Sequence, residues 1–190
     1  MSTARRPARS RNDRRKRSPD LNLKDWIRDI PDFPKKGILF RDLTPLLAHP
    51  PAFRDAVERI TGTYRDQSID AVAAIDARGF LFGAPVALAL GVPLIPLRKA
   101  NKLPPETVGV DYMLEYGKAR IEMIAGALVP DQRVLIVDDL LATGGTAAAA
   151  LRLIEGRGAR AAGAAFVVEL TFLNGRAALG NLSVSSLVQY

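Results

Sequence analysis

The chain has 190 residues, of which 48% are hydrophobic, with a single histidine and no cysteine. The absence of cysteine excludes thiol catalysis, disulfide bonds and cysteine-ligated metal centres, and a lone histidine excludes a histidine-cluster metal site. The net charge of +7 lies in residues 1–18, where eight basic residues accompany one acid, and the rest of the chain is formally neutral.

Residues 1–20 form a basic segment that differs in composition from the rest of the chain. Its arginine, serine and proline content, with almost no large apolar side chain, predicts a disordered tail. Residues 1–18 could contact nucleic acid or another polyanion weakly, or could be a solvated extension without a dedicated role. The remaining residues, 21–190, are enough for one domain with a hydrophobic core.

Neither a membrane span nor a secretory signal is expected from the sequence. The longest uncharged run, residues 80–97, contains prolines and glycines that divide it into a helix, a turn and a buried strand. No apolar stretch at the start of the sequence resembles a signal peptide. We therefore expect a cytoplasmic protein that makes no membrane contact.

Helix and strand patterns alternate along the first half of the domain. Apolar spacing and turn residues predict a short helix over residues 21–30, an amphipathic helix over 53–65, a buried strand over 71–75, a helix over 83–90 and a strand over 92–97. Residues 99–113 lack apolar periodicity and contain Pro104, Pro105 and Gly109, which predicts an exposed mobile loop.

The second half of the domain continues the alternation. The predicted elements are a strand over residues 114–121, a short helix over 124–128, a central strand over 134–137, a helix over 147–155 and strands over 164–170 and 183–188. Alternating strands and helices predict an α/β fold, in which a mostly parallel twisted sheet is flanked by helices.

The most informative segment is residues 134–146. A buried strand is followed by the adjacent acids Asp138 and Asp139 and then by a glycine-threonine loop that leads into a helix. In an open α/β sheet, ligands bind at the carboxyl ends of strands, and a helix N-terminus offers free N–H groups to a phosphate. The two acids lie so close to the glycine-threonine loop that their negative charge would disfavour a bare phosphate there, and they therefore need a partner of their own. Ribose hydroxyls, or Mg²⁺ on a phosphorylated ribose, would suit them. The segment therefore predicts a sugar-phosphate site.

Two commoner phosphate-binding motifs do not fit this segment. A Walker A loop requires a lysine after its last glycine, and Thr146 follows Gly145. A dinucleotide fingerprint must lie between a strand and a helix, whereas Gly156-Arg-Gly158 follows the helix and is typical of a helix end.

Asp138-Asp-Leu-Leu-Ala-Thr-Gly-Gly-Thr146 resembles the phosphoribosyl-diphosphate loop of type I phosphoribosyltransferases. Residues 33–42, 76–83 and 114–117 narrow the resemblance to adenine phosphoribosyltransferases, and it extends from about residue 23 to residue 190. The resemblance implies a type I phosphoribosyltransferase-like fold with a hairpin-like lid. It also implies transfer of the 5-phosphoribosyl group from phosphoribosyl diphosphate to adenine, giving AMP and diphosphate, with substrate-bound Mg²⁺ and a homodimeric enzyme.

The resemblance also assigns the parts of the ligands to particular residues. The ribose hydroxyls go to Asp138 and Asp139, and Glu115 becomes the general acid or base. The 5′-phosphate is assigned to Ala142, Thr143, Gly144, Gly145 and Thr146, the diphosphate to Arg78, Arg98, Lys99 and Lys102, and adenine to Leu39, Phe40, Arg41 and, on the opposite purine face, Leu140.

Several of these residues also have a simpler interpretation. Arg98 and Lys99 could form a solvated strand end, Phe40 could be a core residue, and Glu115 could be an exposed strand carboxylate. Two other functions also remain open. A phosphoribosyl-diphosphate-sensing, nucleic-acid-binding regulator would use the basic tail, although the lid residues and Arg78 favour an enzyme. An enzyme of the same family for 6-oxo purines is less consistent with the segments around Phe40 and Glu115.

Overall fold

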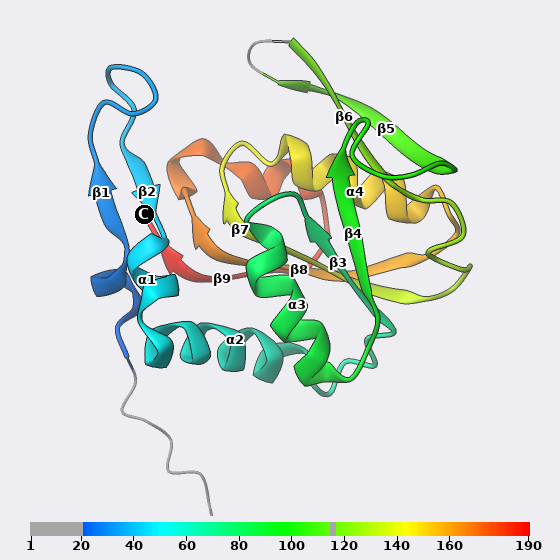
Figure 1. Cartoon of the computed structure of the whole chain (residues 1–190), viewed down its shortest axis with the longest axis horizontal. Helices are drawn as coiled ribbons and strands as arrows, with labels where there is room; N and C mark the ends of the chain where they lie inside the picture. The colour runs from blue at the N-terminus through cyan, green and yellow to red at the C-terminus, as the bar shows by residue number, and fades with distance from the viewer. Residues whose placement is uncertain (1–20, 115–116) are drawn as a thin grey trace, which may run out of the picture.

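The computed structural model of the protein describes residues 21–114 and 117–190. Its largest element is a seven-stranded sheet in the order β5-β6-β4-β3-β7-β8-β9 (Figure 1). The strands are β3 (Ala71–Ile75), β4 (Leu94–Lys99), β5 (Thr107–Leu114), β6 (Gly117–Ile124), β7 (Arg133–Leu141), β8 (Arg160–Glu169) and β9 (Val184–Gln189). The five strands from β4 to β9 in this order are parallel. β6 pairs antiparallel with β4, and β5 pairs antiparallel with β6 at the edge of the sheet. The predicted α/β fold with a mostly parallel sheet is confirmed.

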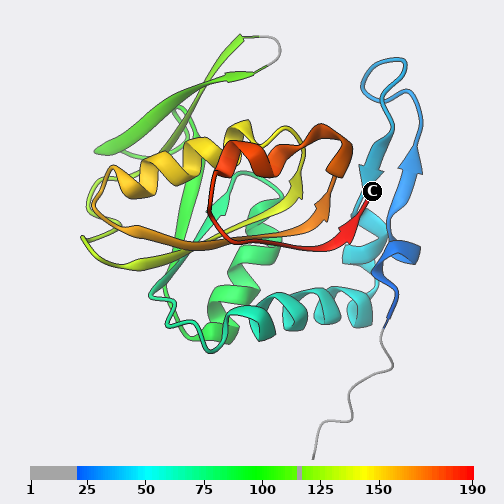
Figure 2. The same ribbon diagram turned by 180° about the vertical axis from the view of Figure 1, so that it is seen from behind.

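Helices cover both faces of the sheet. The helices α2 (Pro50–Tyr64) and α3 (Gly79–Leu90) lie on one face, and α4 (Gly145–Glu155) lies on the other with the 3₁₀ turns η2 (Thr171–Leu173) and η3 (Gly175–Leu179) (Figures 1 and 2). None of the helices in the described part of the chain is both long and apolar enough to cross a membrane.

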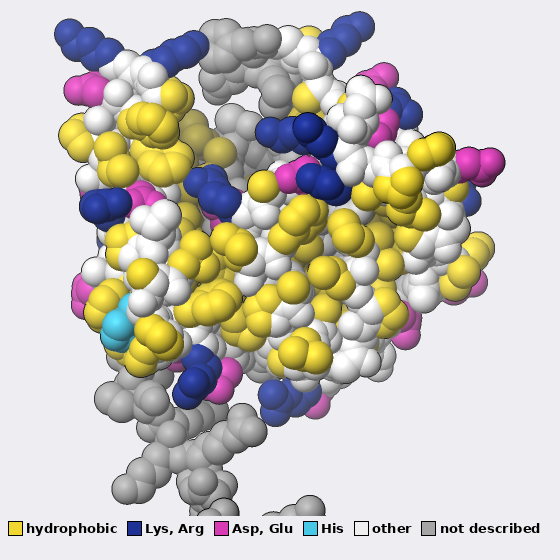
Figure 3. Space-filling model, viewed as in Figure 1, with side chains coloured by type: hydrophobic (Ala, Val, Ile, Leu, Met, Phe, Trp, Pro, Cys, Tyr) yellow, Lys and Arg dark blue, Asp and Glu magenta, His cyan; other side chains and the backbone are white. Residues whose placement is uncertain are grey.

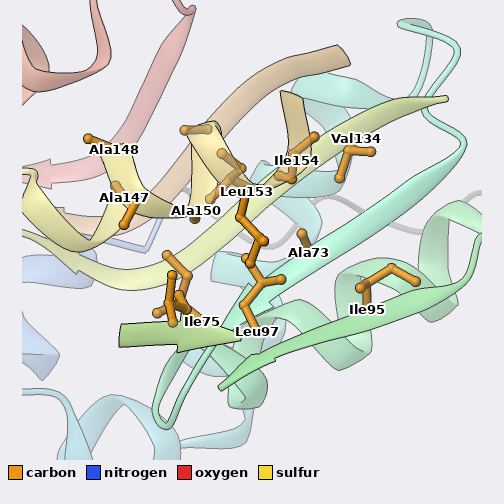
Figure 4. Packing of buried hydrophobic residues seen from close by; sticks show 14 of the residues in the cluster. Ala73, Ile75, Ile95, Leu97, Val134, Ala147, Ala148, Ala150, Leu153 and Ile154 are labelled. Atoms are coloured by element: carbon orange, nitrogen blue, oxygen red, sulfur yellow. The ribbon is translucent and has the colours of Figure 1, made fainter. Parts of the chain in front are cut away.

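The central strand β7 is buried on both faces, which explains its continuous apolar run. Val134 and Ile136 belong to the core on the α4 side, and Leu135 and Val137 belong to the core on the side of α2 and α3. Figure 4 shows the small side chains of α4 on its sheet-facing side, where they allow the helix to approach the strands closely. The sheet is therefore a rigid base for the residues at its carboxyl edge.

A two-stranded ribbon stands beside the end of β9 and carries the segment assigned to adenine (Figures 1 and 2). It consists of β1 (Arg28–Ile30) and β2 (Phe40–Asp42), with the 3₁₀ turn η1 (Leu23–Trp26) before it and α1 (Thr44–Ala48) after it. The predicted helix over residues 21–30 is wrong. Its second half is a strand because β1 pairs with β2, and the Arg28 guanidinium lies 2.6 Å from the Asp42 carboxylate.

The hairpin of β5 and β6 corrects two further predictions. The loop predicted over residues 99–113 is a strand from Thr107 onwards, because β5 pairs along its whole length with β6. The short helix predicted over residues 124–128 is a turn, in which Ala125 donates its N–H to the carbonyl of Glu106 and Gly126 has a φ of +79°. In both segments, pairing between strands overrides the local sequence pattern.

The strand β7 extends four residues beyond its predicted end at Val137. Asp138, Leu140 and Leu141 pair with β8, so the two acids lie within the strand and not after it. The helix α4 begins at Gly145, two residues before its predicted start. The predicted disordered tail, residues 1–20, lies outside the described residues.

Candidate active site

The loop between β7 and α4 forms one wall of a cavity of about 420 Å³. The wall consists of the five residues assigned to the 5′-phosphate, Ala142, Thr143, Gly144, Gly145 and Thr146. The helix begins without a side-chain cap, and its first helical hydrogen bond runs from Ala148 to the carbonyl of Gly144. The preceding N–H groups of the first turn are therefore available to an anion, which the helix dipole also favours.

Two glycines from distant parts of the sequence fix the shape of this loop. Gly144 has a φ of +83°, and a Cβ at this position would overlap the carbonyl oxygen of Gly175. A Cβ at Gly175 would in turn overlap the carbonyl oxygen of Ala142. The loop and the start of η3 therefore touch backbone to backbone. Sequence analysis missed Gly175, because nothing local to it indicates contact with a loop about 30 residues earlier.

The two acids of β7 lie at the junction of this cavity with a second one of about 370 Å³. Both line the second cavity, and Asp138 also lines the cavity of the loop. Asp138 Oδ1 accepts a hydrogen bond from the Asp139 N–H at 2.8 Å. Asp139 is 5% exposed, and its Oδ2 lies 2.7 Å from Arg78 Nε in an ion pair that lacks hydrogen-bond alignment.

Burial of the two acids makes their ionised form unfavourable. Burial raises the pKa of Asp138 well above its usual value, and the charge of Asp139 raises it further. Burial also raises the pKa of Asp139, although the nearby Arg78 guanidinium lowers it in part. A ligand that brings hydroxyl donors or positive charge would relieve this cost. The cavity therefore suits a ribose whose ring becomes cationic during reaction.

Two of the four residues assigned to the diphosphate, Arg78 and Lys99, line the second cavity. The other two, Arg98 and Lys102, do not line it. The Arg98 guanidinium contacts Asp76 Oδ2 at 3.1 Å and donates to the carbonyl of Lys102 at 2.9 Å. Adjacent residues of a strand project to opposite sides, which separates Arg98 from Lys99. The side chain of Lys102 is exposed outside the cavity.

The ribbon places Phe40 beside Arg78. Phe40 lines a third cavity of about 370 Å³ together with Phe33, whose ring meets it edge to face at 5.1 Å. The central carbon of the Arg78 guanidinium lies 5.5 Å from the centre of the Phe40 ring. Arg78 thus links the ribbon to the acids of β7, because its Nε pairs with Asp139.

The other residues assigned to adenine lie in different surroundings. Leu39 is exposed on the ribbon, and Leu140 lines the two cavities at the sheet edge. The Arg41 side chain forms an ion pair with Asp29 and packs on the ring of Tyr190, so it does not line these cavities. Any contact of residue 41 with a base in the ribbon would therefore involve its backbone.

The hairpin contributes a residue that sequence analysis missed. Tyr112 of β5 is buried and lines the second cavity, and its hydroxyl accepts a hydrogen bond of 3.4 Å from the hydroxyl of Thr146. The hairpin therefore reaches the start of α4. Glu115, the expected general acid or base, lies outside the described residues. Figure 3 shows charged side chains around the hollow between ribbon and hairpin, in contrast to the largely apolar face below.

Comparison with known proteins agrees with this geometry. A family model described as a phosphoribosyl transferase domain matches residues 44–177. The adenine phosphoribosyltransferase of Clostridium perfringens is 54% identical over 170 residues, which are 90% of this chain and 99% of that protein. The crystal structure of adenine phosphoribosyltransferase from Thermoanaerobacter pseudethanolicus has a TM-score of 0.86 at 48% identity, covering 88% of this chain and 98% of that one. The Saccharomyces cerevisiae enzyme, complexed with adenine and an iminoaltritol bisphosphate, has a TM-score of 0.82 at 41% identity, covering 87% and 96%.

The chain belongs to the phosphoribosyltransferases, because the family model matches more than half of it. Its parallel sheet carries the acid pair and the glycine loop before α4 at the carboxyl edge, which fits this class. The identity to the relatives extends over nearly their whole length. Within the family, the chain belongs to the adenine phosphoribosyltransferases. The resemblance stated from the sequence is confirmed.

Proposed function

We propose that the protein transfers the 5-phosphoribosyl group of phosphoribosyl diphosphate to adenine, releasing diphosphate and forming AMP. The observation that carries this proposal is the junction of two cavities at Asp138, with the α4 loop on one side and Arg78 and Lys99 on the other. A phosphorylated ribose with a diphosphate at its anomeric carbon has anionic groups at both ends and hydroxyls between them. The order of its groups matches the order of these residues.

The 5′-phosphate would bind the loop of residues 142–146, where the N–H groups of α4 and two threonine hydroxyls can donate to it. The ribose hydroxyls would bind Asp138 and Asp139. Displacement at an anomeric carbon passes through an oxocarbenium-like state, in which the ring carries positive charge. The carboxylates would stabilise this charge, and binding of the ring would in turn favour their ionised form.

The diphosphate would bind between Arg78 and Lys99, which line the cavity next to the acids. Arg98 would contribute through Asp76, whose carboxylate it holds, and Lys102 would add positive charge at the rim. No group of three or more His, Asp or Glu side chains suited to a metal occurs among residues 21–114 and 117–190. Because Mg²⁺ prefers substrate phosphates and water to an all-protein cage, it would take most of its ligands from the substrate, near Asp138 and Asp139. When bound, Mg²⁺ neutralises charge on the leaving diphosphate.

Adenine would lie between Phe40 and Leu140. Stacking of a purine on an aromatic ring contributes on the order of 1–3 kcal/mol without selecting the base. Selection would come from backbone groups of Leu39 and Arg41, since 6-oxo purines would leave those groups without partners. Glu115 would exchange a proton with the imidazole nitrogen of the purine.

We further propose that the enzyme is a homodimer in the cytoplasm. The support is α3, on which Leu81 is 45% and Leu88 is 84% exposed. The face of the molecule that carries α3 is largely apolar (Figure 3). Exposed apolar patches of this kind mark protein interfaces. Sedimentation equilibrium of wild type and Leu88→Glu tests this, because the charge should convert dimer to monomer. Wild-type protein that sediments as a monomer would contradict it.

The substrate assignment is tested by incubating the protein with phosphoribosyl diphosphate, Mg²⁺ and a panel of radiolabelled purine bases. We expect label from adenine to enter AMP and Asp138→Asn to lose this activity. Incorporation of guanine or hypoxanthine in place of adenine would identify a 6-oxo purine enzyme. Binding of phosphoribosyl diphosphate without incorporation of any base would identify a regulator.

A further inference from the structure

An ion pair between a half-exposed arginine and a buried glutamate lies next to the phosphate loop, and neither side chain lines the cavities of the site. Glu169 at the end of β8 is 3% exposed, and its two carboxylate oxygens each lie 2.6 Å from a nitrogen of Arg176 in η3. Ser186 and Gln189 of β9 also donate to Glu169, at 2.6 and 3.2 Å. Glu169 thus accepts four hydrogen bonds, and Arg176 holds the turn η3 against the sheet.

Arg176 adds a second tie between η3 and the sheet. Its remaining terminal nitrogen donates to the carbonyl of Val184 at 2.9 Å. A guanidinium fork on a carboxylate fixes both the distance and the orientation of the two partners, which a single lysine contact would not do. The hydrogen bonds from Arg176 also hold the pKa of Glu169 below its usual value, so the pair is ionised at neutral pH.

The position of η3 sets the position of the phosphate loop. Gly175 directly precedes Arg176, and its backbone is in contact with that of Ala142 and Gly144. Leu179, at the other end of η3, is buried in the same core as Ala147 of α4. A shift of η3 would therefore move the loop or open a gap behind it, because close-packed backbones leave no room for compensation.

We propose that Arg176 and Glu169 are positioning residues for the phosphoribosyl 5′-phosphate. They hold η3 so that the backbone of residues 142–144 keeps the shape in which the α4 amides converge on the anion. Neither side chain lines the cavity of the loop, so their action passes through Gly175. The inference rests on the proposed placement of the 5′-phosphate in that loop.

The test compares the kinetics of Arg176→Gln, Arg176→Lys and a matched control, Arg160→Gln. Arg160 also pairs with a carboxylate, that of Asp131, but both side chains are exposed at the opposite end of β8. We expect Arg176→Gln to raise the KM for phosphoribosyl diphosphate at least about tenfold, since a misplaced anion site loses aligned contacts. Its KM for adenine should stay within about twofold. The KM of Arg176→Lys for phosphoribosyl diphosphate should fall between those of wild type and Arg176→Gln. Both KM values of Arg160→Gln should match those of wild type.

A second measurement separates positioning from general loss of stability. The melting temperature is recorded with AMP, which carries the phosphate, and with adenine, which does not. Arg176→Gln should lose most of the increase due to AMP and keep the increase due to adenine. Equal losses with both ligands, or a KM for phosphoribosyl diphosphate within about twofold of wild type, would reduce the pair to a purely structural role.

Thr143→Val distinguishes failure of the inference from failure of the phosphate placement, because it removes a loop hydroxyl and keeps the side-chain shape. A raised KM for phosphoribosyl diphosphate in Thr143→Val but not in Arg176→Gln overturns the positioning role alone. No change in either variant overturns the placement as well. If Arg176→Gln does not fold, Ser186→Ala replaces it in the test, because it removes one donor to Glu169. Ser186→Ala should raise the KM for phosphoribosyl diphosphate by a smaller factor and leave the KM for adenine unchanged. An unchanged KM for phosphoribosyl diphosphate in this variant overturns the positioning role.

Discussion

The guanidinium of Arg41 lies over the ring of Tyr190, with 3.6 Å between the ring centre and the central guanidinium carbon. Tyr190 is itself tied to the end of the sheet, because its N–H donates to the carbonyl of Glu169 and its carbonyl accepts from Thr171. Arg41 belongs to β2, which also carries Phe40. This contact therefore joins the proposed adenine-binding ribbon to the sheet that carries the acids.

Tyr190→Ala should loosen the ribbon and weaken adenine binding. A cation–π contact contributes about 0.5–2 kcal/mol, so we expect the KM for adenine to rise roughly 2- to 30-fold with little change for phosphoribosyl diphosphate. Steady-state kinetics with each substrate varied in turn measures both constants. Tyr190→Phe keeps the ring and is the control. An adenine KM that is the same in Tyr190→Ala and Tyr190→Phe would contradict the role.

Asp138→Asn should lower turnover and raise stability. Turnover should fall at least about tenfold because the ribose loses an orienting partner. The folded state raises the pKa of Asp138 above its unfolded value, so ionisation of this group at neutral pH opposes folding. The gain in melting temperature over wild type should be present at about pH 8 and shrink towards about pH 4, where both states become protonated.

Calorimetry of wild type, Asp138→Asn and Asp139→Asn over this pH range checks the expectation. Asp139→Asn should gain less than Asp138→Asn, because it also removes the ion pair with Arg78. A lower melting temperature for Asp138→Asn at neutral pH would contradict the assignment of unfavourable charge to this position.

Gly175→Ala should distort the backbone of the phosphate loop. The added methyl group overlaps the carbonyl oxygen of Ala142, and relief of such a clash costs about 1–3 kcal/mol. We expect a lower free energy of unfolding and a higher KM for phosphoribosyl diphosphate. Gly62→Ala in α2 is the control, since nothing lies within 4 Å of the new methyl group. Equal denaturation midpoints for the two variants would show that the loop adapts freely.

Glu115→Gln tests the general acid or base that the sequence predicts. General acid–base catalysis contributes about 10²- to 10⁴-fold, so kcat should fall by that factor while AMP still binds. The measurement is kcat together with the dissociation constant of AMP for both proteins. An unchanged kcat would exclude Glu115 from the proton transfer and assign the proton to solvent or diphosphate.

Removal of residues 1–18 tests the proposed weak contact with polyanions. The truncated protein should keep wild-type kinetics and lose binding to heparin or RNA, since all the excess positive charge lies in this segment. Binding by the full chain should weaken steeply with salt. Equal retention of both proteins on heparin at low salt would rule out the contact.

Sequence reasoning identified best those parts of the chain whose fold is decided locally. The strand over residues 71–75 has the predicted bounds, and the loop before α4 could be recognised because glycines, acids and a helix start follow one another directly. The local pattern missed the strands β1 and β5 because each depends on a partner strand, although the family resemblance implied a hairpin-like lid where β5 lies. Gly175 and Tyr112 reach the site only through the fold, so no local pattern could reveal them.

The backbone contact between Gly144 and Gly175 also limits how this site can be transplanted. In the sequence, the phosphate loop looks like a segment that could be transferred to another protein by itself, since the acids, the glycines and the helix are contiguous within residues 138–155. In the folded molecule its outer surface is completed by η3, which enters after a further strand. A graft into another α/β scaffold would therefore have to carry residues 169–179 as well, or supply an equally close backbone of its own.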